Sequence, residues 1–328
     1  MAFITLHKTN FFNNLDIIAA KAGDKDKVAL VLKDNAYGHG LLEIARMANE
    51  YGIRRAVVRK MDEARLIAPY FDYILLLDEI GDDMRFRYTI NALAQIDRLP
   101  RGMRVELKVD TGMHRNGVAY EEVDSALALI VKRGLTCKAI FTHYRSADEL
   151  SSEFFWQKKR FELLKKTYGD FLFHSYNSAA LFRSRSCDEA MVRVGIAAYG
   201  CLELPRPFDR TQLRPVLSLY GEKIATRKLA KGERIGYGGI YEAKRDETVS
   251  TYDIGYADGL LRSASNGYSA PHRERLLGRI SMDNVSFTGD KERLLLFDDA
   301  RSFAKAAGTI PYEVLTGLNR AIKRVIRE

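Results

Sequence analysis

Short apolar runs alternate with amphipathic stretches along the first two thirds of the chain. The runs predict strands at residues 28–33, 56–59, 73–78, 88–92, 104–109, 138–143, 171–174 and 191–193. Between them, apolar residues recur at helical spacing, as at 41–51, 121–133 and 149–168. Eight strand–helix units in about 190 residues predict an α/β fold of the parallel (β/α)8 or TIM-barrel type.

The pattern changes at about residue 216. Runs at 216–220, 248–254 and 276–287, together with glycine turns at 231–239, predict strands joined by tight turns, and a closing helix is expected near 311–327. We therefore expect a barrel over residues 1–215 and a β-rich C-terminal domain over 216–328. No low-complexity linker separates them, so the two domains should pack closely.

Composition and charge narrow the class of protein. The chain has 328 residues, of which 46% are hydrophobic, and a net charge of +9 that is spread among acidic residues. No nucleic-acid motif is found, and the apolar runs are too short to span a membrane. Three cysteines without CxxC spacing argue against a disulfide framework and a metal site. With no signal peptide at the start, we expect a cytoplasmic protein.

The segment VALVLKDNAYGHG at residues 28–40 carries the first candidate chemistry. A buried strand runs into a glycine-punctuated turn, which places Lys33 at the mouth of a site with little water. There the neutral amine is favoured, and it can condense with an aldehyde to form a Schiff base. The alternative is a lysine that extends to solvent. Tyr37 and the glycines beside it favour a site.

Two segments after the seventh and eighth predicted strands can bind an anion. They are HSYNSAA at residues 174–180 and RVGIAAYG at residues 193–200. Ser178 offers a hydroxyl group, and Gly195 and Ile196 offer turn amides, where barrel enzymes often bind phosphate. Taken alone, the first segment would also suit a helix cap.

Three further segments complete a pattern that runs in order almost to the end of the chain. They are LKVDTGMHRNG at 107–117, DIGYADGL at 253–260 and GRISMD at 278–283. With the segments above, they resemble the alanine racemase family. The resemblance implies pyridoxal 5′-phosphate as cofactor, linked to Lys33, and no metal.

The resemblance also implies roles for cofactor-binding residues. Tyr37, Ser178, Gly195 and Ile196 match the residues that hold the phosphate, and Arg193 matches the arginine that donates to the pyridine nitrogen. Arg115 matches the arginine that contacts the phenolic oxygen of the cofactor and the substrate carboxylate. His143 would bridge Arg193 and a catalytic tyrosine. Ordinary structural roles, a barrel ion pair for Arg193 and a core position for His143, are the alternatives.

Racemisation needs a base on each face of the substrate α-carbon. The family pattern assigns Lys33 to the D-enantiomer and Tyr256 to the L-enantiomer, although Tyr256 could also be an ordinary turn tyrosine. The amide of Met282 would help to hold the substrate carboxylate, and Lys108 matches a lysine that is carbamylated in several members. The remaining matches are supporting residues or lie on the entrance path: Asp148, Arg279 and Asp283.

The family further implies a head-to-tail homodimer in which Tyr256 and Met282 serve the partner's barrel. The expected function is interconversion of L- and D-alanine, an amino-acid substrate, to supply D-alanine for peptidoglycan. One departure is Arg320, which stands where many members carry a pocket tyrosine, so a racemase of broader specificity is an alternative. A fold-related basic amino-acid decarboxylase and a non-catalytic cofactor carrier are less favoured, because of the 253–260 and 278–283 segments.

Overall fold

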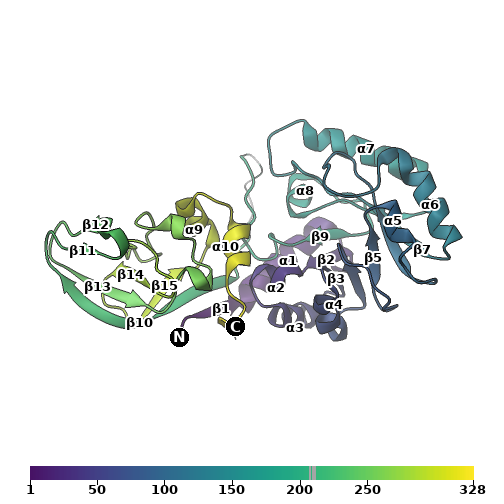
Figure 1. The fold of residues 1–328 in the computed structure, drawn as a ribbon. Helices are drawn as coiled ribbons and strands as arrows, with labels where there is room; N and C mark the ends of the chain where they lie inside the picture. The colour runs from purple at the N-terminus through teal and green to yellow at the C-terminus, as the bar shows by residue number, and fades with distance from the viewer. Residues whose placement is uncertain (207, 209–211) are drawn as a thin grey trace.

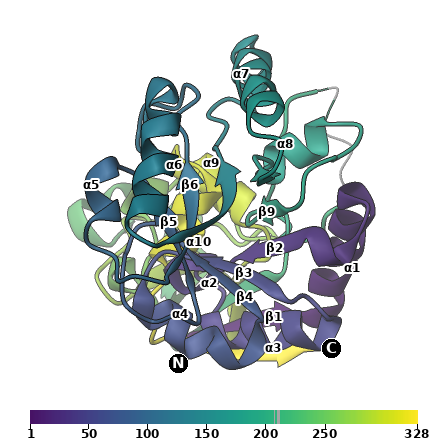
Figure 2. The same cartoon turned by 90° about the vertical axis from the view of Figure 1, so that its right-hand side faces the viewer.

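The computed structural model describes residues 1–206, 208 and 212–328. Figure 1 shows two bodies joined side by side, a barrel with helices around it and an elongated β-rich domain, and in Figure 2 the barrel faces the viewer with the second domain behind it. Among the described residues, no helix is both long enough and apolar enough to cross a membrane. The predicted fold class, a (β/α)8 barrel followed by a β-rich domain, is confirmed.

Eight parallel strands form the barrel. They are β2 (Val28–Val31), β3 (Arg55–Val58), β4 (Tyr73–Leu76), β5 (Arg87–Ile90), β6 (Arg104–Lys108), β7 (Thr136–Phe141), β8 (Leu172–His174) and β9 (Val192–Val194). Their order is β8-β7-β6-β5-β4-β3-β2-β9. Two backbone hydrogen bonds join the outer strands, from Ala190 N to Phe173 O at 3.1 Å and from Arg193 N to Tyr176 O at 2.8 Å. The carboxyl ends of all eight strands therefore meet at one rim.

The barrel helices are amphipathic and bury one face against the strands. In the helix over residues 41–51, Ile44, Ala45 and Ala48 are fully buried, as period-3.6 patterning requires. The helices are α1 (Lys8–Ala22), α2 (Lys33–Tyr37), α3 (Leu41–Tyr51), α4 (Met61–Ile67), α5 (Leu93–Ile96), α6 (Val123–Lys132), α7 (Glu153–Thr167) and α8 (Ser178–Arg183), with 3₁₀ turns η1 (Lys25–Lys27), η2 (Ala68–Tyr70) and η3 (Tyr120–Glu122).

The second domain is built on one mixed sheet of six strands. These are β1 (Phe3–His7), β10 (Leu217–Leu229), β13 (Glu247–Tyr252), β14 (Val285–Thr288), β15 (Arg293–Phe297) and β16 (Lys323–Arg327). A small hairpin pairs β11 (Arg234–Ile235) with β12 (Tyr241–Glu242). The other elements are η4 (Tyr237–Gly239), η5 (Tyr256–Asp258), η6 (Arg262–Ala264), α9 (Ala300–Ala307) and α10 (Pro311–Gly317).

The two ends of the chain lie together in this sheet. Strand β1 pairs antiparallel with β10 and parallel with β16, with Phe3 opposite Lys323. The expected closing helix over residues 311–327 is therefore wrong beyond Gly317, where the chain turns and continues as a strand. The backbone hydrogen bonds offered by β1 outweigh the helical preference of this segment.

Candidate active site

Lys33 follows β2 and begins a turn of unusual backbone geometry. Four consecutive residues, Asp34 to Tyr37, have φ between 52° and 59°, so the expected loop is a left-handed helical turn, labelled α2. For residues with a side chain this conformation costs roughly 1–2 kcal/mol each. The surrounding structure must supply that energy, and strain of this kind concentrates at functional sites.

A polar cradle lies where β8 and β9 end. Ser178 is 5% exposed, and its Oγ accepts hydrogen bonds from Gly195 N at 3.1 Å and Ala197 N at 3.3 Å. A Cβ atom on Gly195 would lie 2.6 Å from the Tyr37 hydroxyl. Only glycine allows this approach, and Ile196 beside it is buried. The structure thus brings Tyr37, Ser178 and Gly195 together, with hydroxyl groups and turn amides that suit a phosphate.

Arg193 is buried and firmly held. Its Nη1 donates to His174 Nδ1 at 2.5 Å and His174 O at 2.8 Å, and its Nη2 donates to Thr142 O at 2.6 Å. Burial lowers the pKa of Arg193 to about 10. The guanidinium therefore stays protonated at neutral pH, while its orientation is fixed by these hydrogen bonds at the barrel rim.

A buried carboxylate stands behind this arginine. Glu106 is 1% exposed and accepts hydrogen bonds from His174 Nε2 at 2.8 Å, Tyr73 OH at 2.8 Å and Arg87 Nη1 at 3.0 Å. Burial alone would raise the pKa of Glu106, but His174 and Arg87 outweigh it and lower the pKa. Neither His174 nor Glu106 was predicted as a site residue. The available signal was a carboxylate inside an apolar strand, which requires a buried partner.

Positive charge gathers around His143. Burial and the charges of Arg193, Lys108, Arg115 and Lys33 hold the pKa of His143 well below its usual range, so the imidazole is neutral. Burial, Arg115 and Arg193 also lower the pKa of Lys108 to about 8. The amine of Lys108 donates to Asn116 Oδ1. The side chain of His143 makes no hydrogen bond with a residue in the described ranges, so its bridge to Arg193 stays a prediction.

The two motifs of the second domain meet through their backbones. Tyr256 N donates to Ser281 O at 3.0 Å, and Ala257 N donates to Met282 O at 2.9 Å. The side chains of Tyr256 and Met282 nonetheless point outward, with exposed fractions of 42% and 54%. Asp283 and Arg279 are exposed as well. Within the part of the chain that the structure describes, the Tyr256 hydroxyl has no hydrogen-bond partner.

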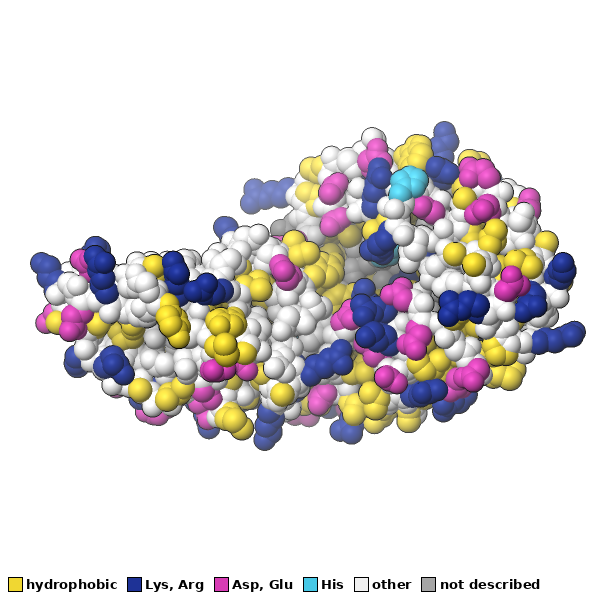
Figure 3. Space-filling model, viewed as in Figure 1, with side chains coloured by type: hydrophobic (Ala, Val, Ile, Leu, Met, Phe, Trp, Pro, Cys, Tyr) yellow, Lys and Arg dark blue, Asp and Glu magenta, His cyan; other side chains and the backbone are white. Residues whose placement is uncertain are grey.

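Two residues from α10 and the loop after β7 lie near the phosphate cradle. The ring of Tyr312 lies 5.9 Å from the ring of Tyr37, centroid to centroid. Partial burial and the charge of Asp148 raise the pKa of Tyr312, although 40% of the residue is exposed. Arg320 is exposed as well. An aromatic ring therefore covers one side of Tyr37 even though position 320 carries an arginine. Figure 3 shows the hollow between the two domains, with charged side chains around it.

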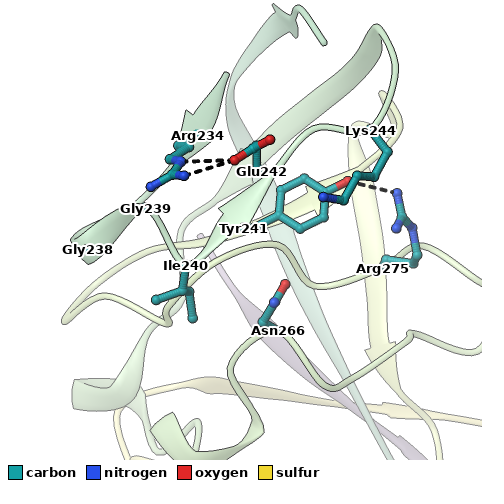
Figure 4. Close-up of a pocket in the computed structure, with 9 residues that line it drawn as sticks. All are labelled: Arg234, Gly238, Gly239, Ile240, Tyr241, Glu242, Lys244, Asn266 and Arg275. Carbon is teal, nitrogen blue, oxygen red and sulfur yellow. Dashed lines mark hydrogen bonds and ion pairs between the residues drawn. The ribbon is translucent and has the colours of Figure 1, made fainter. Parts of the chain in front are cut away.

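A separate cavity of about 730 Å³ lies at the hairpin of the second domain. Figure 4 shows two of its arginines bonded to neighbours: Arg234 with Glu242 at 3.0 Å, and Arg275 with the Tyr241 hydroxyl at 3.2 Å. None of the residues predicted to bind cofactor or substrate lines it. The rim of the barrel is therefore the candidate active site.

Comparison with known proteins agrees with this placement. The family model for the N-terminal domain of alanine racemase matches residues 6–203, and the model for the C-terminal domain matches residues 216–326. The alanine racemase of a Nitratiruptor species is 44% identical over 333 residues, which cover 99% of each chain.

Solved structures are similar over the whole chain. An alanine racemase from Clostridium difficile 630 superposes with a TM-score of 0.89 at 27% identity, covering 100% of this chain and 96% of that one. The alanine racemase of Bacillus anthracis, in a crystal structure with bound L-Ala-P, has a TM-score of 0.87 at 28% identity, covering 100% and 95%. The similarity therefore includes both domains and the rim of the barrel.

Proposed function

The chain belongs to the alanine racemase family, and on this premise we propose that it interconverts L- and D-alanine with bound pyridoxal 5′-phosphate. The family is dependent on this cofactor. One observation carries the proposal: Tyr37, Ser178 and Gly195 form an anion cradle at the strand ends, and the turn that carries Tyr37 begins at Lys33. In parallel barrels this rim is where catalytic residues lie.

The residues at the rim fit pyridoxal phosphate. Tyr37, Ser178, Gly195 and Ile196 would hold the phosphate, and Arg193 would face the ring nitrogen. When bound, the cofactor supplies an aldehyde for the substrate amine and a conjugated ring that stabilises negative charge at the α-carbon. Arginine does not readily give up a proton, so Arg193 would leave the ring nitrogen unprotonated. Charge at the α-carbon is then delocalised less, which favours returning the proton over side reactions.

Two bases would exchange the α-proton. The amine of Lys33 would serve the D-enantiomer and the phenol oxygen of Tyr256 the L-enantiomer, each from its own face. The neutral imidazole of His143 can accept a hydrogen bond from the phenol. Arg115 offers a planar fork for the substrate carboxylate, and the Met282 amide would assist it. Lys108, in carbamylated form, would add negative charge beside Arg115 and steady it.

A head-to-tail homodimer would complete the site. The side chains of Tyr256 and Met282 are largely exposed on the second domain, and the Tyr256 hydroxyl binds no barrel residue in the described part of its own chain. We propose that each second domain presents this surface to the barrel of its partner, with Asp148 and Arg279 on the entrance path and Asp283 beside Met282. The barrel domain (1–215, apart from β1, which pairs within the second sheet) and the second domain (216–328) would thus serve different sites.

The proposed setting is the cytoplasm, where D-alanine is needed for peptidoglycan precursors. An assay of D-alanine formed from L-alanine, with and without added pyridoxal phosphate, tests the activity. We expect turnover only with cofactor. Borohydride reduction of the loaded protein should attach the cofactor to Lys33, and the label should be lost in Lys33→Ala. Labelling of a different lysine, or turnover without cofactor, would refute the proposal.

Arg320 favours one alternative, a racemase that accepts larger amino acids. A tyrosine at this position would narrow the entrance, whereas Arg320 is exposed and Tyr312 is an aromatic neighbour of Tyr37. Racemisation rates for alanine, serine, lysine and arginine distinguish an alanine-specific racemase from one that accepts larger amino acids. We expect alanine to be fastest, and faster turnover of a basic substrate would favour the alternative.

A further inference from the structure

The strained turn from Asp34 to Tyr37 joins the two groups that the proposed function needs most. Lys33 lies at its start and Tyr37 at its end, so the backbone of this turn sets the distance between the amine and the phosphate cradle. Left-handed conformations of residues with side chains persist only where neighbouring groups hold them. Those neighbours can be identified.

The start of the turn is held by Glu63 on α4. Glu63 is 7% exposed, and its Oε1 accepts a hydrogen bond from Asp34 N at 2.7 Å. Its Oε2 accepts from Arg59 N at 3.0 Å and Lys60 N at 3.2 Å. One carboxylate thus ties the residue after Lys33 to the end of the neighbouring strand β3.

The end of the turn is held by Arg324, on the last strand of the second domain. Its Nε and Nη2 donate to Gly38 O at 3.2 and 2.9 Å. Its Nη1 donates to Asn319 O at 3.1 Å, Arg320 O at 2.9 Å and Ile322 O at 2.5 Å. A Cβ atom on Gly38 would lie 1.9 Å from Leu315 O, so the backbones of the two domains touch here. Figure 1 shows α10 and the C-terminus beside α2.

We propose that Glu63 and Arg324 are positioning residues that hold the two ends of this turn and so fix the spacing of Lys33 and Tyr37. The inference depends on the proposed function, because that spacing matters only if both residues engage one cofactor. Glu63 holds the start of the turn and Arg324 holds its end. Loss of Glu63 should displace Lys33, whereas loss of Arg324 should displace Tyr37 and weaken phosphate binding.

The test uses Glu63→Gln and Arg324→Met in the full chain. Matched controls are Asp62→Asn, an exposed neighbour on the same helix, and Arg327→Met, an exposed residue on the same strand. Pyridoxal phosphate is titrated into cofactor-free protein and its dissociation constant measured by absorbance. Borohydride reduction then measures the yield of label on Lys33.

We expect Arg324→Met to bind the cofactor at least about tenfold more weakly, with kcat restored by excess cofactor. Glu63→Gln should trap less label on Lys33 and keep a lowered kcat at saturating cofactor, with the KM for alanine unchanged. If both residues had only a structural role, the loss of cofactor affinity would not be confined to one variant and the loss of labelling and kcat to the other. Arg324→Lys, which keeps one donor group, should lie between wild type and Arg324→Met, and it serves if Arg324→Met does not fold.

Two outcomes would overturn the inference. One is that both variants match their controls within about twofold in cofactor affinity and labelling. The other is that excess cofactor restores kcat in both variants or in neither. If the wild-type protein itself does not bind pyridoxal phosphate, the proposed function fails first, so the two failures are distinguishable.

Discussion

The Arg193 guanidinium donates a hydrogen bond to Nδ1 of His174 at 2.5 Å. Arginine can only donate, so Nδ1 is unprotonated and the proton of the neutral ring lies on Nε2, which points at Glu106. Burial lowers the pKa of His174 to about 4, in keeping with a neutral ring. Arg193 is therefore oriented by a histidine whose tautomer is set by a carboxylate.

Replacing His174 should affect both stability and activity. His174→Phe keeps the ring volume but removes a buried partner from both Glu106 and Arg193. We expect a loss of about 1–3 kcal/mol in the free energy of unfolding, measured by urea titration, and a fall in kcat. The exposed His272 provides the control as His272→Phe. Unchanged stability and kcat in His174→Phe would contradict the role given to this histidine.

The pH dependence of stability should include a contribution from His39. Its side chain is fully buried, and burial lowers its pKa to about 4 although Nδ1 bonds to the carbonyls of Ala36 and Tyr37. The unfolded chain binds the proton at a higher pH than the folded one. Stability from this group is therefore complete above about pH 6.5 and is lost as pH falls toward 4, by about 2 kcal/mol between pH 7 and 5.

His39→Asn tests this contribution, because its amide can still donate to the carbonyls but does not titrate. Urea unfolding at both pH values should show a smaller pH effect in the variant than in wild type. Equal pH effects in the two proteins would contradict the prediction.

The amine of Lys108 should react with carbon dioxide. With a pKa lowered to about 8, about half of the amine is neutral at that pH. We expect a carbamate signal by NMR when the protein is placed in ¹³C-bicarbonate at pH about 8. Lys108→Met should lack the signal, and Lys132→Met, on the exposed end of α6, should retain it. A spectrum of Lys108→Met identical to that of wild type would refute the assignment.

Mixed dimers test whether Tyr256 serves the neighbouring subunit. Lys33→Ala and Tyr256→Phe chains should each be nearly inactive alone. Random reassociation of equal amounts places half of the chains in heterodimers, and each heterodimer has one complete site out of two. We expect recovery of about a quarter of wild-type activity. If Lys33 and Tyr256 act within one chain, mixing should restore nothing.

Local sequence was enough to predict the barrel. Its strands are buried apolar runs with helices between them, so each element is visible within about ten residues. The elements of the second domain were harder to predict from local sequence. β16 was predicted as helix because the partner that makes it a strand, β1, lies at the other end of the chain, and no local pattern records such a pairing.

The residues of the site likewise fall into those that local motifs predicted and those that depend on distant parts of the chain. Tyr37, Ser178 and Gly195 were expected from their motifs, and the structure brings them together. His174 and Glu106 were not expected, because a buried hydrogen-bonded pair of this kind depends on how β6 and β8 come together inside the barrel. The left-handed turn after Lys33 was also missed, since Ala36 and Tyr37 carry side chains that usually avoid positive φ.

The position of β1 has a consequence for how the protein is made. This strand emerges from the ribosome ahead of the whole barrel, yet its partners β10 and β16 are synthesised after the barrel is complete. During translation both edges of β1 stay unpaired until β10 is made, and the second sheet can close only after β16 has also been synthesised. Cutting the gene between the two domains would therefore give an N-terminal fragment in which β1 has no partner. The C-terminal fragment would lack the strand that lies between β10 and β16.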